Sequence, residues 1–417
     1  MNRELFRTII SEGWEYISEV ELTRRDVDFE QEGNYVIVGA RQAGKSYMLF
    51  QRIHELMRQG HGMDEIVYIN FDDERLIGIE AKDLDLILQA YHSMIGNKPV
   101  LFFDEIQNVD GWANFARRLV NQKYRVYISG SNAKMLSRDI ETVLGGRYLE
   151  MALFPYSFRE YLRSMGCELS KNWEYGRSKD KISLLFNDYF HWGGFPEITR
   201  YKGKRAWLNS LFSRIFLNDI VVRHRIKNEG ALRMIVKRMA ESVKQPTSYN
   251  RLSNLVKSTG ITCSPSSVID YVRYMTEACI VFSLENYASK FTERETVKKH
   301  YFVDNGLLNL FLTDSETFLL ENICAIHLYK QYGEDLYYYN KNIEVDFFVP
   351  GRNMAVQACY RLADEDTIAR EVSALEKLHT LYPLEKAFIV TRDDEATIQK
   401  NGLEIAVIPV WKWLLKD

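Results

Sequence analysis

The chain has 417 residues, of which 46% are hydrophobic and 27% are charged. These fractions are typical of globular proteins and exclude a disordered chain, and the length allows about three domains with separate cores. The net charge of −3 excludes a whole-chain attraction to nucleic acid or anionic lipid, so such binding would need a local basic patch.

The cysteines and the apolar runs predict a cytoplasmic protein. Five cysteines lie far apart without a CxxC pair, which indicates reduced thiols. The first residues carry charges and no long apolar core, so we expect no secretory signal. The most apolar run, at 208–222, is interrupted by Arg214 and Asp219 and falls short of the roughly 18 apolar residues of a membrane span.

The first motif lies between an apolar run at 35–38, which predicts a strand, and a helical pattern at 47–59. It fits the phosphate-loop pattern GxxxxGK[ST], and the nucleotide-binding residues it predicts are Gly39, Ala40, Arg41, Gln42, Ala43, Gly44, Lys45, Ser46 and Tyr47. Glycines let the backbone approach phosphate, and amides at the helix start can bind its oxygens. We expect Lys45 to neutralise the β and γ phosphates of ATP and Ser46 to bind Mg²⁺. A chance strand-to-helix turn is the alternative.

Four more strand-like runs follow between helical patterns, at 65–71, 100–104, 125–129 and 147–153. Alternating strands and helices predict an α/β fold with a parallel sheet covered on both faces. The run at 100–104 ends in Asp104 and Glu105, where such sheets bind ligands. We expect Asp104 to hold Mg²⁺ through water and Glu105 to polarise the water that attacks the γ-phosphate. An acidic turn at the strand end is the alternative.

The strand at 65–71 lies between the two motifs, and Glu105 directly follows Asp104. Both features resemble the additional-strand ATPases, whose AAA+ members place that strand between the other two in the sheet. The resemblance therefore implies an AAA+ core with ATP and Mg²⁺ as its ligands.

Two further residues match AAA+ positions. A polar residue after the fourth strand, called sensor 1, touches the γ-phosphate or the attacking water; Asn132 fits best and Ser131 second, with a helix-capping residue as the alternative. Arg147 stands where AAA+ arginine fingers reach a neighbouring subunit's γ-phosphate, which would make the active form a homo-oligomer. A structural arginine paired with a carboxylate is the other interpretation.

The order of motifs adds a more specific resemblance. GxRQxGKS, FFDEIQN with a following GW, ISGSN, GRYLE, LFPYSFREYL and GGFPE occur in sequence. This series is similar to the bacterial and archaeal AAA-domain ATPases that carry a C-terminal domain of unknown function 4143, and it covers nearly the whole chain. The resemblance implies that Pro196, in a Gly-x-Pro turn of the lid, lies near the nucleotide base. A plain helix-breaking turn is the alternative.

We predict four parts: an AAA+ core with an N-terminal helix at 1–155, a helical lid at 156–228, a winged-helix-like unit at 229–288 and a restriction-endonuclease-like α/β domain at 289–417. The third part is predicted from a helix at 249–258, a second helix that begins at Ser264-Pro265, and a strand at 280–284.

DNA binding through the winged-helix-like unit is one interpretation, but its second helix carries Asp270, Arg273 and Glu277, only one of them positive. A packing module is therefore favoured. The basic runs at 223–227 and 298–300 could meet phosphates or be solvated faces.

The tail resembles the PD-(D/E)xK nuclease fold, with a strand at 301–304, a helix at 316–332 and a hairpin made by strands at 335–339, 345–349 and 354–358. Active members place an Asp on the second strand and Glu-x-Lys on the third, so that two acids bind Mg²⁺. Asp346 matches the first acid and Glu321 could be a helix acid, but the third strand reads Gln357-Ala358-Cys359. We therefore expect a degenerate fold kept for binding or assembly.

The leading hypothesis is an ATPase whose nucleotide state is coupled to the lid, the winged-helix-like unit and the tail. A nucleotide-dependent switch or scaffold with low turnover is the second hypothesis. The third is a DNA-acting defence or mobile-element ATPase. The protein client is not identified by the sequence.

Overall fold

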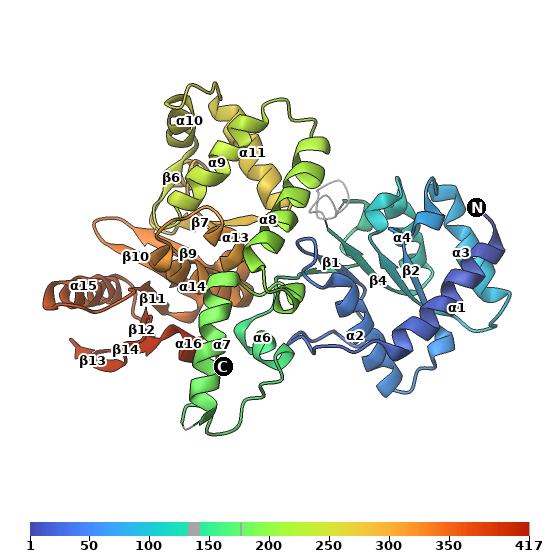
Figure 1. The fold of residues 1–417 in the computed structure, drawn as a ribbon, viewed down its shortest axis with the longest axis horizontal. Coiled ribbons are helices and arrows are strands. Elements are labelled where there is room, and N and C mark those ends of the chain that lie inside the picture. Colours follow the sequence, from blue (N-terminus) through green and yellow to red (C-terminus); the bar gives the residue numbers. More distant parts are fainter. Residues whose placement is uncertain (132–141, 176, 417) are drawn as a thin grey trace. The chain divides into compact units, whose positions relative to one another are not determined.

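The computed structural model describes residues 1–131, 142–175 and 177–416 and contains two compact units, Met1–Phe154 and Pro155–Asp417. Each unit has its own sheet (Figure 1). Each also has its own core of buried apolar side chains.

The first unit contains a five-stranded sheet in which each neighbouring pair of strands is parallel. Its strands, in the order β2-β3-β4-β1-β5 across the sheet, are β1 (Tyr35–Val38), β2 (Ile66–Asn70), β3 (Val100–Asp104), β4 (Arg125–Gly130) and β5 (Leu149–Ala152). Among the described residues of this unit, the α-helices are α1 (Arg3–Glu19), α2 (Lys45–Arg58), α3 (Asp85–His92) and α4 (Trp112–Asn121). All five predicted strands are confirmed, as is the α/β class of this unit.

The predicted position of the additional strand is wrong. The strand between β1 and β3 is β4, and β2 lies at the edge, paired with β3. The polar residues Tyr68 and Asn70 leave β2 only half-buried, whereas β4 is almost wholly buried, so β2 is the strand suited to an edge. α1 packs along this edge, and the indole of Trp14 donates a hydrogen bond of 2.7 Å to the Ile66 carbonyl.

Helices cover both faces of this sheet because consecutive residues of a strand point to opposite sides. Phe102 shares a core with Leu49 and Ile53 of α2, whereas Phe103 approaches Phe115 of α4 with ring centroids 5.9 Å apart. Figure 1 shows α2 and α4 on the two sides of the sheet. Because the strands are parallel, the carboxyl ends of β1 and β3 lie at the same end of the sheet, between these two helix layers.

The second unit is built around a nine-stranded sheet of mixed direction. Its strands, in the order β13-β14-β12-β11-β10-β9-β7-β8-β6, are β6 (Thr247–Ser248), β7 (Val281–Asn286), β8 (Val297–Phe302), β9 (Tyr337–Asn340), β10 (Glu344–Val349), β11 (Met354–Ala358), β12 (Lys386–Thr391), β13 (Ala396–Lys400) and β14 (Leu403–Pro409). The labelled helices of this unit are α6 (Phe158–Ser164), α7 (Arg177–Trp192), α8 (Lys204–Arg214), which continues into a π-helix (Ile215–Val222), α9 (Glu229–Glu241), α10 (Tyr249–Lys257), α11 (Pro265–Glu277), α12 (Phe291–Arg294), α13 (Asn305–Asn309), α14 (Glu316–Tyr332), α15 (Glu365–Leu381) and α16 (Val410–Trp413).

The nine-stranded sheet crosses the predicted boundary at 288/289. β7 and β9 pair in parallel through Glu285 with Tyr337 and Asn286 with Tyr338. The Asn286 side chain joins the same strands a second time, since it accepts from the Asn340 amide at 3.0 Å and donates to the Asn340 carbonyl at 2.8 Å. The division of the chain into four parts stays a prediction.

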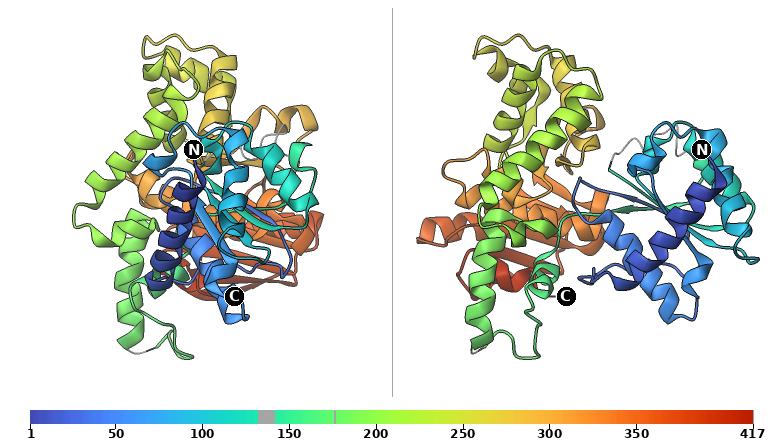
Figure 2. Two further views of the ribbon diagram at one scale, coloured as in Figure 1. Left: turned by 90° about the vertical axis from the view of Figure 1, so that its right-hand side faces the viewer. Right: turned by 45° about the vertical axis from the view of Figure 1, so that its right-hand side comes forward.

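The helices α9, α10 and α11 pack against one another, and Figure 2 shows them grouped as the yellow-green helices in both views. Ser264 caps α11, as its position before Pro265 predicts, because its hydroxyl accepts a hydrogen bond of 3.1 Å from the Ser267 amide. The arginine of α11 is paired within its own helix, Arg273 with Asp270 at 2.9 Å.

Candidate functional site

The loop between β1 and α2 has a backbone that depends on its glycines. A Cβ on Gly39 would lie 2.2 Å from the Leu153 carbonyl oxygen, so only glycine fits there. Gly44 has φ 98° and Gln42 has φ 59°, and the Ala43 amide donates to the Ala40 carbonyl at 3.2 Å. Left-handed residues within a loop turn successive amides to one side, which is the geometry of an anion-binding nest.

The helix that follows begins without a side-chain cap. Gly44 occupies the N-cap position of α2 and can offer no side-chain oxygen to the first amides of the helix. The next two residues are Lys45 and Ser46, whereas Tyr47 points outward and is 44% exposed. The start of α2 therefore combines amides that no described side chain caps with a cation and a hydroxyl group.

Lys45 is buried and lies against its own loop. Its Nζ donates to the carbonyls of Gly39 at 3.2 Å and Ala40 at 3.1 Å, and lies 3.5 Å from Glu105 Oε1. Two of these three contacts are with neutral carbonyl oxygens, so the positive charge of Lys45 is only partly balanced.

Asp104 is buried at the end of β3 and is surrounded by hydroxyl groups. It accepts hydrogen bonds from Tyr68 at 2.9 Å and from Ser129, and Ser46 is also within hydrogen-bonding reach. Burial raises the pKa of Asp104, and the hydrogen bonds from Ser129, Ser46 and Tyr68 oppose that rise. The carboxylate thus has hydroxyl donors around it and no ammonium in contact among the described residues.

Glu105 has the opposite environment. Burial raises its pKa, but the charge of Lys45 and the hydrogen bonds from Gln107 and Ser131 outweigh that effect, so the pKa is lowered overall. Its backbone is left-handed, with φ 52°, and its Oε1 lies 3.5 Å from Lys45 Nζ. The two adjacent acids are therefore held in different states of solvation and pairing.

Gln107 holds the Glu105 carboxylate and has an unpaired atom of its own. Its Nε2 donates to Glu105 and, at 3.4 Å, to the Ser131 hydroxyl. Among the described residues its Oε1 is buried without a hydrogen-bond partner. A buried orphan acceptor beside an acid is a position where a water molecule can bind.

These groups fit a magnesium nucleotide. Ser46 and Asp104 offer the hard oxygen ligands that Mg²⁺ prefers, and Lys45 and the loop amides suit phosphate. Over residues 1–131, 142–175 and 177–416, no group of three or more His, Cys, Asp or Glu side chains could hold a metal. A metal at Asp104 would therefore need phosphate and water oxygens as further ligands, as Mg²⁺ usually does.

The other predicted site residues have different outcomes. Asn132 lies outside the described residues. Arg147 is exposed, and its guanidinium donates to the Leu144 and Gly145 carbonyls at 3.4 Å each; among the described residues it forms no ion pair with a carboxylate. The finger and the structural arginine both stay predictions for Arg147.

Pro196 belongs to the second unit, where it begins a short 3-10 helix (Pro196–Arg200). The glycines before it are fixed by packing within this unit: the Gly194 amide donates to Asp304 at 2.7 Å, and a Cβ on Gly193 would lie 2.0 Å from that carboxylate. A contact of Pro196 with a nucleotide stays a prediction.

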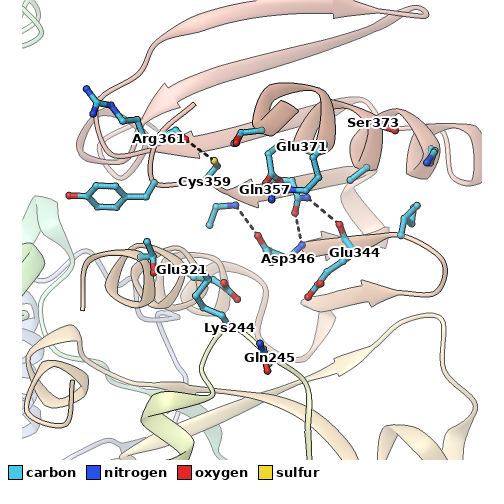
Figure 3. Close-up of a pocket in the computed structure, with 18 of the residues that line it drawn as sticks. Lys244, Gln245, Glu321, Glu344, Asp346, Gln357, Cys359, Arg361, Glu371 and Ser373 are labelled. Carbon is cyan, nitrogen blue, oxygen red and sulfur yellow. Dashed lines mark hydrogen bonds and ion pairs between the residues drawn. The ribbon is translucent and has the colours of Figure 1, made fainter. Parts of the chain in front are cut away.

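The predicted tail acids lie together in the second unit. Glu321 on α14 and Asp346 on β10 both contact the ammonium of Lys299 on β8. Figure 3 shows Glu321, Asp346 and Gln357 around one cavity. The interpretation of residues 298–300 as a solvated basic face is wrong for Lys299 and His300, which are buried because β8 runs inside the sheet between β7 and β6.

Comparison with known proteins defines the family. An uncharacterized protein of Methanocaldococcus jannaschii, MJ1544, is 33% identical over 429 residues, which cover 99% of this chain and 95% of that protein. The chain belongs to the family of that archaeal protein. An uncharacterized protein of Haemophilus influenzae is 29% identical over 403 residues, covering 94% of this chain and 96% of that protein.

Two segments of the chain match known domain families. Residues 31–162 match the AAA domain, and residues 183–317 match a domain of unknown function, DUF8612. A Walker-type ATPase of Pyrococcus abyssi is 12% identical with a TM-score of 0.43, over 71% of this chain and 99% of that one. The sequence match and the parallel five-stranded sheet identify an AAA-type P-loop domain in the first unit.

The prediction of a C-terminal domain of unknown function 4143 is wrong, because the domain that matches is DUF8612. The motifs that carried the resemblance end at Glu197, near the start of the matched segment, so they contained little information about the tail. The described structure of this family member has no helix long and apolar enough to cross a membrane.

Sequence reasoning missed several residues at both places. At the AAA-type site these are Tyr68, Gln107 and Ser129. Gln107 was close enough to Glu105 in sequence to be considered, whereas Tyr68 and Ser129 reach Asp104 from other strands. Lys299 was visible only as one member of a basic run.

Proposed function

We propose that the first unit binds ATP with Mg²⁺ and hydrolyses it, and that the lid, the winged-helix-like part and the tail respond to the nucleotide state. The proposal is supported by one observation above all: Lys45, Ser46, Asp104 and Glu105 converge at one end of an AAA-type sheet. Cation, hydroxyl and carboxylates in this arrangement are the parts that phosphoryl transfer to water requires.

In this proposal the loop amides and Lys45 bind the phosphates. Lys45 would exchange the Gly39 and Ala40 carbonyls for phosphate oxygens, which are better partners because they are charged. Ser46 and Asp104 would hold Mg²⁺, and this ion would neutralise negative charge on the β and γ phosphates. Tyr68 and Ser129 would position Asp104 by donating to its two oxygens.

Glu105 is the proposed general base. Its lowered pKa keeps it ionised at neutral pH, so it can accept a proton from the attacking water without first losing one. Gln107 would orient its carboxylate through the Nε2 contact.

Three roles extend beyond the residues that converge in the first unit. We propose Asn132 as sensor 1, Arg147 as a finger that reaches a neighbouring copy, and Pro196 as a lid residue beside the base. The finger role is supported by the exposure of Arg147 and by the carbonyls that its guanidinium contacts, since an exposed guanidinium held by such contacts can leave them at low energetic cost. This role makes a homo-oligomer the active form.

The test uses two substitutions and two matched controls. Lys45→Ala should lower ATP affinity by roughly a hundredfold or more, because the phosphate cation is lost. Glu105→Gln should leave ATP binding within a few-fold of wild type and lower hydrolysis by roughly a hundredfold or more, because the amide cannot accept the proton. Nucleotide binding is measured by equilibrium titration and hydrolysis by phosphate release.

Lys82→Ala and Glu80→Gln are the controls, since these residues form an exposed ion pair of 2.8 Å in the same unit. Both should leave binding and hydrolysis unchanged. Unimpaired ATPase activity in Lys45→Ala and Glu105→Gln would refute the proposal.

A slow nucleotide-dependent switch is the second candidate. It is favoured by the contacts of Glu105 with both Lys45 and Gln107, which would have to loosen before this carboxylate could serve a water molecule. Phosphate release with excess ATP separates the two candidates. An ATPase continues at a steady rate, whereas a switch stops after one equivalent.

A further inference from the structure

The second unit encloses an ammonium group among three carboxylates. Lys299 Nζ lies 3.0 Å from Asp346 Oδ1, 3.1 Å from Glu321 Oε1 and 3.4 Å from Glu344 Oε1. The Lys299 side chain is 0% exposed and that of Glu321 is 2% exposed, whereas Glu344 is half in solvent. The carboxylates line a cavity of about 930 Å³, shown in Figure 3.

The fold directs all these groups to one point. Lys299 comes from β8, Glu321 from α14, and Glu344 and Asp346 from β10. The pairing of β10 with β9 is irregular between Val345 and Phe348, and a bulge of this kind re-aims the side chain within it, here Asp346.

The nuclease-like resemblance implies a divalent cation at Asp346, but the groups present do not fit one. Asp346 Oδ1 and Glu321 Oε1, the oxygens a metal would need, both accept from Lys299. Asp346 Oδ2 accepts from the Ala358 amide at 3.0 Å, and Tyr301 also donates to Glu321 at 2.8 Å. A second cation at this point would be repelled by the ammonium at close range.

The side chain of Gln357 bonds to the backbone of β10 and does not offer its oxygen to a metal. Its Oε1 accepts from the Asp346 amide at 2.8 Å, and its Nε2 donates to the Glu344 carbonyl at 3.2 Å, as the dashed lines in Figure 3 show. Its amide therefore fastens β11 to β10 where a third-strand carboxylate would have faced the metal.

We propose that Lys299 is a covalently held replacement for a divalent cation, whose ammonium fills the position between Glu321 and Asp346 and keeps metal out. The surrounding charges support this role. Although burial lowers the pKa of Lys299, the charges of Glu321, Asp346 and Glu344 more than reverse the effect and keep the ammonium protonated. The site carries its own positive charge at any physiological metal concentration.

The experiment counts Mn²⁺ ions bound to the nucleotide-free full-length protein by electron paramagnetic resonance. Lys299→Met should bind one more Mn²⁺ per chain than wild type, because two carboxylates lose their cation and keep their positions. The double variant Lys299→Met with Asp346→Asn should lose that ion again. The matched control is Lys298→Met, which removes the neighbouring lysine that pairs with Glu285 at 3.0 Å and should add no ion.

Two outcomes would overturn the proposal. One is a folded Lys299→Met protein, as judged by circular dichroism, that binds no more Mn²⁺ than wild type. The other is a wild-type protein that loses one Mn²⁺ on Asp346→Asn. This second comparison needs no change at Lys299, so it decides the matter even when Lys299→Met does not fold: equal binding supports the proposal and a lost ion refutes it.

Discussion

The two units each bury a lysine beside acids, and they use it in opposite ways. Lys45 donates to two neutral carbonyls and lies 3.5 Å from one carboxylate, that of Glu105. Asp104 accepts hydrogen bonds from hydroxyl groups instead. Lys299 is in contact with three carboxylates at once. The same residue types therefore produce a cation that a ligand can recruit in one unit and a cation already neutralised in the other.

The difference follows from where each lysine stands. Lys45 begins a helix directly after a loop, so its ammonium lies against carbonyls of that loop at the start of the helix. Lys299 lies within β8, and α14 packs against this strand, so its side chain meets acids of the sheet and of this helix. Position in the fold decides whether a buried charge serves binding or stability.

The sharpest way to break this comparison is to remove each lysine and measure stability. Lys299→Met should lower the free energy of unfolding by about 3–5 kcal/mol, because buried carboxylates lose their partner. Lys45→Met should lower it by less than about 1 kcal/mol, because mainly carbonyl contacts are lost. Urea unfolding without nucleotide measures both. Equal losses would show that the two lysines do not differ as described.

The second unit should lose stability in acid because it buries a neutral histidine, His300, close to Lys299. Burial, aided by the charge of Lys298, lowers the pKa of His300 to about 4, so the folded unit keeps this ring neutral. A group whose pKa is lower in the folded state than its ordinary 6.5 contributes full stability above pH 6.5, and this stability is lost as the pH falls toward 4. The loss reaches about 3 kcal/mol at pH 4.

His300→Asn tests this origin, because asparagine can still reach the Ser283 hydroxyl, which lies 2.7 Å from His300 Nδ1. Unfolding free energies of the variant should fall less steeply than those of wild type between pH 6.5 and 4.5. Parallel curves for the two proteins would remove His300 as the cause.

The smallest expected effect concerns the base of the first unit. Gln107→Leu removes one of the hydrogen bonds that lower the pKa of Glu105, so this pKa should rise. Less of the base is then ionised in acid, and the hydrolysis rate at pH 5, relative to pH 8, should fall by roughly threefold. Steady-state phosphate release measures the ratio, and ATP affinity serves as the control because Lys45 is untouched.

Local patterns predicted much of the fold. The strands of the first unit and the helix Glu316–Tyr332 follow from hydrophobic periodicity within each segment, and the loop at 39–46 from a motif whose residues are contiguous. The order of the strands did not follow, since a parallel strand can insert at several places and its neighbours are chosen by distant segments. β4 between β1 and β3 is such a case.

The candidate sites divide along the same line. Asp104 and Glu105 were found because they follow an apolar run directly, whereas Tyr68 and Ser129 reach Asp104 from 36 and 25 residues away in sequence. Lys299 contacts Asp346 across 47 residues, and a lysine in a basic run is normally a solvated one. The apolar residues that follow it, Tyr301 and Phe302, were the available sign that this strand is buried.

The two-pair junction of β7 with β9 has a consequence for dissecting the molecule. A fragment that starts at residue 289 would lack β7 and leave the backbone of β9 without its neighbour, and unpaired strand edges promote aggregation. A cut between Phe154 and Pro155 divides no sheet, since the two sheets lie on either side of it. Fragments for separate study should therefore be divided there, so that each keeps a complete set of strands.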